Sequence, residues 1–177
     1  MNFKKIAYKV TALGAVAMAS LVFTACSSGD KSERGGEVET GGVGIANRAL
    51  QAVSYSPNNK GYSYKGTSTG ADFPTWSSAA KPQISNALSQ VGDDYVIQVT
   101  GHTCAIGPRN APGDGRKGNT YYSEQRAKAV RDGLVKAGVP ANKLVVKGVA
   151  DTQALPGIDP KDQKQRRVTF QVVPAPK

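Results

Sequence analysis

The sequence predicts an α/β sandwich of the α+β class, in which one small mixed β-sheet packs against helices. Segments with strand periodicity alternate with segments of helical periodicity from about residue 45 to residue 173, which favours a sheet covered by helices. The chain has 177 residues, of which 39% are hydrophobic, enough for a single core. Its 20 glycines and 10 prolines indicate long loops between the elements.

The first part of the predicted domain contains two helices and one strand. Apolar residues at helical spacing predict a short helix over residues 45–53. Residues 61–69 alternate tyrosines with small or polar residues, which predicts a strand. Residues 76–91 place apolar side chains three or four apart, which predicts a second helix that Pro82 kinks or divides.

The second part carries the clearest elements. Residues 95–100 are rich in β-branched side chains and predict a strand, and the glycines and prolines of residues 101–119 predict a long loop after it. Residues 120–137 show the strongest helical pattern. Two further strands are predicted at residues 144–147 and 168–173.

The N-terminus has the features of an export signal. Three lysines in the first nine residues precede an uncharged apolar run over residues 12–23, which is too short for a comfortable membrane span. The run ends in Phe23-Thr24-Ala25-Cys26, which resembles a bacterial lipobox, whose cysteine is acylated. We predict a signal peptide over residues 1–25 and lipidation, such as palmitate, at Cys26. Ordinary cleavage after Ala25 is the alternative.

The remaining chain divides into a tether and a domain. Residues 27–44 contain no aromatic residue and only valine among the large aliphatic residues, so they cannot bury enough surface to offset the entropy of ordering. We expect the lipidated cysteine and a flexible tether over residues 26–44 and a folded domain over residues 45–177.

The charge of the chain suggests an acidic partner. The full chain has 23 basic and 13 acidic residues, and removal of the signal peptide with its three lysines leaves 20 basic residues. Nucleic acid is the usual partner of such a chain, but export argues against it. Anionic polymers of the cell envelope and lipid headgroups are the partners that remain.

Motifs for catalysis and metal binding give no positive signal. Residues 113–118 satisfy G-x-G-x-x-G, but two prolines and about a dozen residues separate them from the preceding strand, so they predict a flexible basic loop and no nucleotide cofactor. His102 and Cys104 lack further ligands for a metal site. We expect His102 to bond the backbone at the strand end and Cys104 to be a partly buried thiol. The sequence therefore predicts neither an enzyme nor a cofactor.

Arg126 is the strongest candidate for ligand binding. It lies near the start of a predicted helix that follows a glycine-rich loop at a strand end, a place where small ligands often dock, and its guanidinium suits a carboxylate. The alternative is a solvated helix arginine that pairs with Glu124.

Several separated motifs together resemble one family. Thr100-Gly101-His102-Thr103, the run from Asn119 to Ala127, and Arg166-Arg167-Val168 are similar in kind and order to the OmpA-like domain, the peptidoglycan-associating module of outer-membrane proteins and lipoproteins. The likeness runs from about Tyr62 to Val173 and looks closest to spirochaetal OmpA-type surface lipoproteins, which share Ile106-Gly107-Pro108 and a lengthened loop.

The resemblance implies a ligand and a set of site residues. In the family, the arginine and asparagine of the helix motif and an aspartate directly after Gly-His-Thr hold the diaminopimelate of the peptidoglycan stem peptide. Carried over by position, these are Arg126, Asn119 and Cys104, with Thr103 beside them. Cys104 replaces the aspartate, and we expect either Arg126 to favour its thiolate or Asp114 on the loop to substitute for the missing carboxylate.

Two functions follow from this likeness. The first is a non-enzymatic, lipid-anchored protein of the outer membrane, whose domain in the periplasm or at the surface binds peptidoglycan, with Arg109, Arg116 and Lys117 adding diffuse attraction. The second is a ligand-defective paralogue that acts as a surface or adhesion protein with protein partners, because Cys104 replaces the binding aspartate. A redox-responsive thiol at Cys104 is a third possibility.

Overall fold

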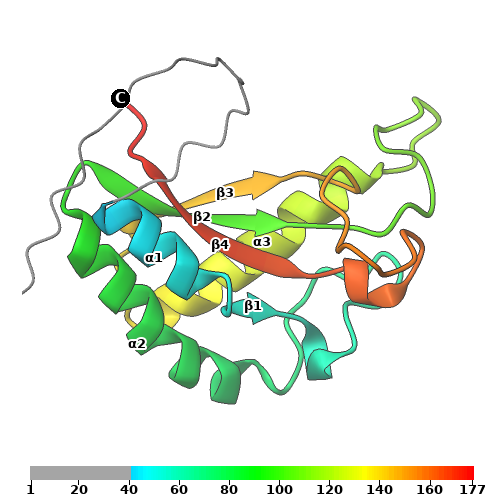
Figure 1. Ribbon diagram of the computed structural model, residues 1–177. Coiled ribbons are helices and arrows are strands. Elements are labelled where there is room, and N and C mark those ends of the chain that lie inside the picture. Colours follow the sequence, from blue (N-terminus) through cyan, green and yellow to red (C-terminus); the bar gives the residue numbers. More distant parts are fainter. Residues whose placement is uncertain (1–40) are drawn as a thin grey trace, which may run out of the picture. The chain divides into compact units, whose positions relative to one another are not determined.

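A computed structural model describes residues 41–177 of the chain. They contain a four-stranded mixed sheet, shown in Figure 1. The strand order is β1-β4-β2-β3; β2 runs parallel to β3, and β4 runs antiparallel to both β1 and β2. The predicted signal peptide and lipidation site, and most of the predicted tether, lie outside the described residues. The strands are β1 (Ser54–Tyr55), β2 (Tyr95–Gly101), β3 (Leu144–Gly148) and β4 (Val168–Pro174).

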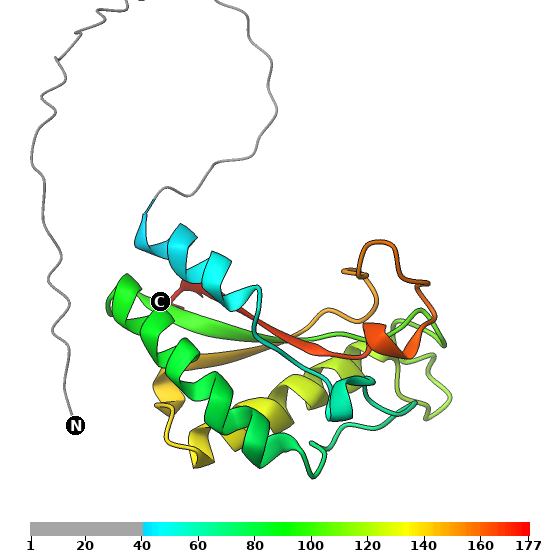
Figure 2. The ribbon, with the colours of Figure 1, turned by 60° about the horizontal axis from the view of Figure 1, so that its bottom comes forward.

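Three α-helices accompany this sheet within residues 41–177: α1 (Gly42–Leu50), α2 (Phe73–Val91) and α3 (Asn119–Lys136). Figure 2 shows α2 and α3 side by side on one face of the sheet. The mixed sheet with helices packed on it confirms the predicted fold class. None of the described helices is long and apolar enough to cross a membrane.

The core lies between the sheet and the helices α2 and α3, and it also includes Ala46 and Leu50 of α1. Ile97 and Val99 of β2 are fully buried and belong to the same hydrophobic cluster as Val130 and Leu134 of α3. Burying aliphatic side chains of this size is worth roughly 1.5–3 kcal/mol each. The side chains of Ile97 and Val99, two positions apart on β2, therefore point to the face of the sheet that α3 covers.

Gly101 sets how closely α3 approaches the end of β2. A Cβ atom at this position would lie 1.8 Å from the backbone oxygen of Ser123. Only glycine permits this approach, because every other residue would push the helix away from the strand. The close packing holds the first half of α3 directly beside the loop that follows β2.

The edge of β4 is closed by a side chain of α1. The Oδ1 atom of Asn47 accepts a hydrogen bond of 2.7 Å from the backbone N–H of Val172. β1 pairs with β4 only at Val168 and Thr169, so α1 protects the edge where β1 stops.

The structure corrects three predictions about the elements. Residues 61–69 form turns, not a strand, and the strand of this region is the short β1. The second helix is not divided at Pro82: α2 is continuous, and Pro82 is exposed, so the carbonyl that its ring leaves without a donor can face water. The first helix begins at Gly42, inside the predicted tether, because the next residue, Val43, packs against the core.

Candidate functional site

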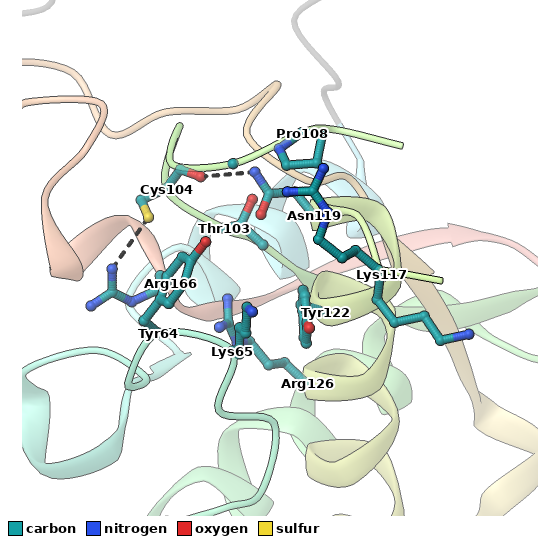
Figure 3. A pocket seen from close by; sticks show the side chains of 12 residues that line it. Tyr64, Lys65, Thr103, Cys104, Pro108, Lys117, Asn119, Tyr122, Arg126 and Arg166 are labelled. Atoms are coloured by element: carbon teal, nitrogen blue, oxygen red, sulfur yellow. Dashed lines mark hydrogen bonds between the residues drawn. The ribbon is translucent and has the colours of Figure 1, made fainter. Parts of the chain in front are cut away.

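All four residues predicted to bind peptidoglycan line one pocket, which lies between the loop after β2 and the first half of α3. These residues are Thr103, Cys104, Asn119 and Arg126, and Figure 3 shows their side chains around it. We call this the α3 pocket. The loop after β2 and the start of α3 therefore bring together residues that lie between positions 103 and 126 of the chain.

Arg126 is buried, with only 1% of its surface exposed. Its Nε donates to the carbonyl of Gly66 at 2.8 Å, its Nη1 to that of His102 at 2.9 Å and its Nη2 to that of Ser63 at 3.4 Å. Burial lowers the pKa of Arg126 to about 10, and the nearby positive charge of Arg166 acts in the same direction. The alternative of a solvated arginine paired with Glu124 is therefore wrong.

The segment predicted as a strand at residues 61–69 instead curls around two arginines. The carbonyls of Ser63 and Gly66 accept from Arg126, and the carbonyl of Tyr62 accepts from Nε of Arg166 at 2.5 Å. The ring of Tyr62 lies 5.0 Å from the guanidinium carbon of Arg126. These carbonyls bind arginine side chains, so they are not available to a neighbouring strand.

Arg166 also lines the pocket. The sequence indicated it only as part of the Arg166-Arg167-Val168 motif, and we predicted no role for its side chain. Its Nη1 donates to Sγ of Cys104 at 3.2 Å, the contact drawn in Figure 3. Cys104 is 2% exposed, deeper than the predicted partly buried thiol. Of the two arginines, Arg166 and not Arg126 hydrogen-bonds the sulfur. The pair Arg166-Arg167 directly before the buried strand β4 was the signal for it in the sequence.

Asp114 does not supply the missing carboxylate. It forms an exposed ion pair with Arg116, 2.6 Å between Oδ2 and Nη2, and it does not line the α3 pocket. In the same way Asp151 pairs with Arg109 at 2.9 Å. Of the basic loop residues Arg109, Arg116 and Lys117, only Lys117 lacks an ion pair with another described residue.

Asn119 connects the pocket to the loop after β2. Its Nδ2 donates to the carbonyls of Cys104 and Ile106, both at 3.2 Å. Its backbone N–H donates to the carbonyl of Pro108 at 2.8 Å. Asn119 therefore holds the start of the loop against the N-terminus of α3, while its Oδ1 accepts no hydrogen bond from a described residue.

Thr103 has an unused hydroxyl at the pocket. The residue is 5% exposed, and its Oγ1 has no hydrogen-bond partner among the described residues. Its backbone N–H donates to the carbonyl of Ala150 at 2.7 Å, which fixes the turn. A buried hydroxyl without a partner is uncommon in a folded protein, so Thr103 is a ready donor or acceptor for a bound group.

His102 does not line the pocket, and its side-chain hydrogen bond differs from the prediction. Its Nε2 forms a 2.8 Å hydrogen bond with the hydroxyl of Thr169 and not with the strand-end backbone. Burial lowers the pKa of His102 to about 3, with a further contribution from the charge of Arg167. His102 therefore stays neutral across the physiological range.

The glycine-rich loop does not form a nucleotide cradle. Gly113 and Gly115 have φ angles of 88° and 86°, and a Cβ at either position would meet no atom within 4 Å. The loop tip is thus open to solvent and not held against a helix N-terminus. Within residues 41–177, no group of three or more His, Cys, Asp or Glu side chains is placed to hold a metal ion.

Comparison with known proteins agrees with this arrangement. The model of the OmpA family matches residues 75–167, which include β2, the loop after it, α3 and β3. The chain belongs to the OmpA family. No curated protein sequence matches the chain at a significant level.

Solved structures share the OmpA-like fold at low sequence identity. The peptidoglycan-associated lipoprotein from Burkholderia pseudomallei is 16% identical over 75% of this chain and 99% of its own, with a TM-score of 0.52. The C-terminal domain of MotB from Helicobacter pylori is 17% identical over 67% and 86%, with a TM-score of 0.51. The OmpA-like domain of FopA1 from Francisella tularensis is 24% identical over 66% and 70%, with a TM-score of 0.46. The recognition of an OmpA-like domain is confirmed, whereas the narrower likeness to spirochaetal proteins stays a prediction.

Proposed function

We propose that the chain is a non-enzymatic lipoprotein of the outer membrane, whose OmpA-like domain binds peptidoglycan non-covalently and links the membrane to the cell wall. The observation that carries the proposal is that Thr103, Cys104, Asn119 and Arg126 line one pocket. By the family resemblance, Arg126, Asn119 and Cys104 occupy the positions that hold the ligand, with Cys104 in place of the aspartate. A structural relative is itself named a peptidoglycan-associated lipoprotein.

Arg126, Thr103 and Asn119 would each make a different hydrogen bond to the ligand. A guanidinium has five N–H donors. Arg126 donates three of them to the backbone carbonyls of Gly66, His102 and Ser63, so its two remaining N–H groups would donate to a carboxylate of the stem peptide. Thr103 would add its free hydroxyl. Asn119 would contribute its Oδ1 and would hold the loop in place through its Nδ2.

Retention on insoluble peptidoglycan tests the proposal. Thr103→Val removes a hydroxyl that makes no hydrogen bond within the described residues, so the fold should be unaffected. We expect about tenfold weaker retention, because a hydrogen bond to a charged group is worth roughly 1.5–3 kcal/mol. Thr152→Val is the matched control, since its exposed hydroxyl bonds only to the carbonyl of Val149. No retention of the unaltered protein would contradict the proposed function.

Lipid anchoring at Cys26 is a separate part of the proposal. We propose that residues 1–25 are removed, that Cys26 is acylated and that residues 26–41 connect the anchor to the domain. Mass spectrometry of the N-terminal peptide would detect the added acyl mass on Cys26. Cys26→Ala should release the protein from the membrane fraction. Recovery of an unmodified Cys26 in the mature protein would argue for ordinary cleavage instead.

One observation favours a second candidate, a ligand-defective paralogue with protein partners. All three nitrogens of Arg126 already donate to backbone carbonyls, and a thiol stands where the family has a carboxylate. In that case the unaltered protein would not bind peptidoglycan, and Cys104→Asp would create the binding. Retention of the unaltered protein would exclude this candidate.

A further inference from the structure

The charges around the α3 pocket are all of one sign. Its lining contains Lys65, Arg116, Lys117, Arg126 and Arg166 and no aspartate or glutamate. Only Arg116 takes part in an ion pair among the described residues. The ammonium groups of Lys65 and Lys117 lie 5.6 Å and 5.3 Å from the ring centres of exposed tyrosines, which carry no charge to oppose them. The pocket is thus an uncompensated cationic site.

Cys104 is the reason for this imbalance. A carboxylate has two oxygens that accept from guanidinium or ammonium donors, whereas a cysteine has one sulfur, a weak acceptor. Here that sulfur already accepts from Arg166. An ammonium group of a ligand would find no carboxylate at this position and would be repelled by Arg126 and Arg166.

The neutral polar groups of the pocket suit a peptide end. The unpartnered hydroxyl of Thr103, 95% removed from solvent, can donate to a carboxylate oxygen. The Oδ1 of Asn119 can accept from an amide N–H. A peptide C-terminus presents both groups, and its own nitrogen is an uncharged amide.

Building on the proposed function, we infer that the α3 pocket selects a carboxylate with no ammonium group beside it, such as the C-terminal carboxylate of a peptide, over an amino-acid zwitterion such as diaminopimelate. The buried arginines attract the carboxylate, Thr103 hydrogen-bonds it, and the missing carboxylate at position 104 removes the partner of an ammonium group. Selectivity would therefore be set by Cys104.

Two small acids with the same carbon chain test this selectivity. Pimelate carries two carboxylates, and meso-diaminopimelate adds an ammonium beside each. We expect pimelate to bind the purified protein about 30-fold more tightly or better, the lower end of the effect of an unpaired desolvated charge. Titration followed by calorimetry or NMR gives both constants. Inorganic phosphate, as a third ligand, separates carboxylate recognition from general attraction of anions.

Two variants link the selectivity to named side chains. Cys104→Asp should reverse the order, so that diaminopimelate binds more tightly than pimelate. Thr103→Val should weaken pimelate about tenfold, with Thr152→Val as the unaffected control. If Cys104→Asp does not fold, the comparison of the two acids on the unaltered protein and the Thr103→Val result decide alone.

The remaining outcomes overturn the inference. Equal or tighter binding of diaminopimelate to the unaltered protein would show that no acidic partner is needed for the ammonium group. Phosphate binding as tightly as pimelate would reduce the pocket to a general anion site. Binding of neither acid, with peptidoglycan retention intact, would overturn this inference and leave the proposed function standing. Failure of peptidoglycan retention itself would overturn the proposed function.

Discussion

Two sets of arginines lie close to the loop after β2, and they differ in burial and in the partners of their guanidinium groups. The loop arginines, Arg109 and Arg116, are exposed and form ion pairs with Asp151 and Asp114. The buried arginines, Arg126, Arg166 and Arg167, form no ion pair among the described residues. Their hydrogen bonds go to backbone carbonyls and to the sulfur of Cys104.

The two sets differ in how much their charge contributes to stability and to binding. An exposed ion pair is screened by water and salt and adds little to stability. A buried guanidinium has lost its hydration, and carbonyl dipoles compensate only part of that loss. The buried arginines therefore hold the turns together and still leave a positive potential that an anion can neutralise. A loop arginine is therefore the natural control for a substitution of Arg126.

The largest expected difference is in stability. Arg126→Met removes the donors to the carbonyls of Ser63, Gly66 and His102. We expect a loss of about 2–4 kcal/mol, because buried acceptors left unsatisfied cost about 1–3 kcal/mol each and water can reach some of them. Urea unfolding followed by circular dichroism measures it.

Arg109→Met is the matched control, since it removes an exposed, ion-paired arginine from the loop after β2. Its unfolding midpoint should stay close to that of the unaltered protein. Equal losses in the two variants would mean that the hydrogen bonds of Arg126 to the backbone do not hold the turn of residues 62–66.

A smaller effect concerns pH and the histidine beside the buried arginines. The pKa of His102 falls to about 3 in the fold, mainly through burial, from its usual 6.5. Below pH 6.5 His102 binds a proton in the unfolded chain but stays neutral in the folded chain. The neutral imidazole therefore does not lower the free energy of unfolding above pH 6.5. As pH falls from 6.5 toward 3, this free energy decreases by at most about 1.4 kcal/mol per pH unit.

His102→Gln tests this slope. Glutamine can keep the hydrogen bond to Thr169 that Nε2 makes, but it does not titrate. The free energy of unfolding should decline less between pH 7 and 4.5 in the variant than in the unaltered protein. This range avoids Asp93, Asp114 and Asp151, whose lowered pKa values confine their loss of stability to more acidic solutions. Parallel slopes would show that His102 accepts a proton inside the fold.

The sequence predicted the elements whose signals are local. β2 is rich in β-branched residues and α3 has a long helical pattern, and both were found within a residue or two of their predicted bounds. The family motifs then placed Thr103 and Arg126 at one pocket, because a strand end and the following helix start must lie together in such a sheet.

What the sequence could not show depends on contacts between distant residues. Arg126 and Gly66 are 60 positions apart, and Arg166 and Cys104 are 62 apart. No local pattern reveals that the carbonyls of residues 62–66 bind arginines, and the alternating tyrosines of this segment indicated a strand instead. The burial of Arg126 was missed for the same reason, since its neighbours in the sequence are those of a surface helix.

The smallest expected effect lies on the other side of the comparison, at the ion pair of Arg109 and Asp151. The hydrogen bond from Arg109 holds the pKa of Asp151 below its usual value, so the contribution of this pair is present near neutral pH and is lost as pH falls through the lowered pKa. Asp151→Asn should shift the unfolding midpoint only slightly at low salt, and the shift should vanish at high salt because mobile ions screen exposed charges. Thermal unfolding at the two salt concentrations measures this, with Arg126→Met as the contrasting variant whose loss should persist. A decrease of the unfolding midpoint in Asp151→Asn that persists at high salt would mean that the ion pair stabilises the loop as strongly as Arg126 stabilises its turn. In that case burial would not decide how much an arginine contributes to the stability of this domain.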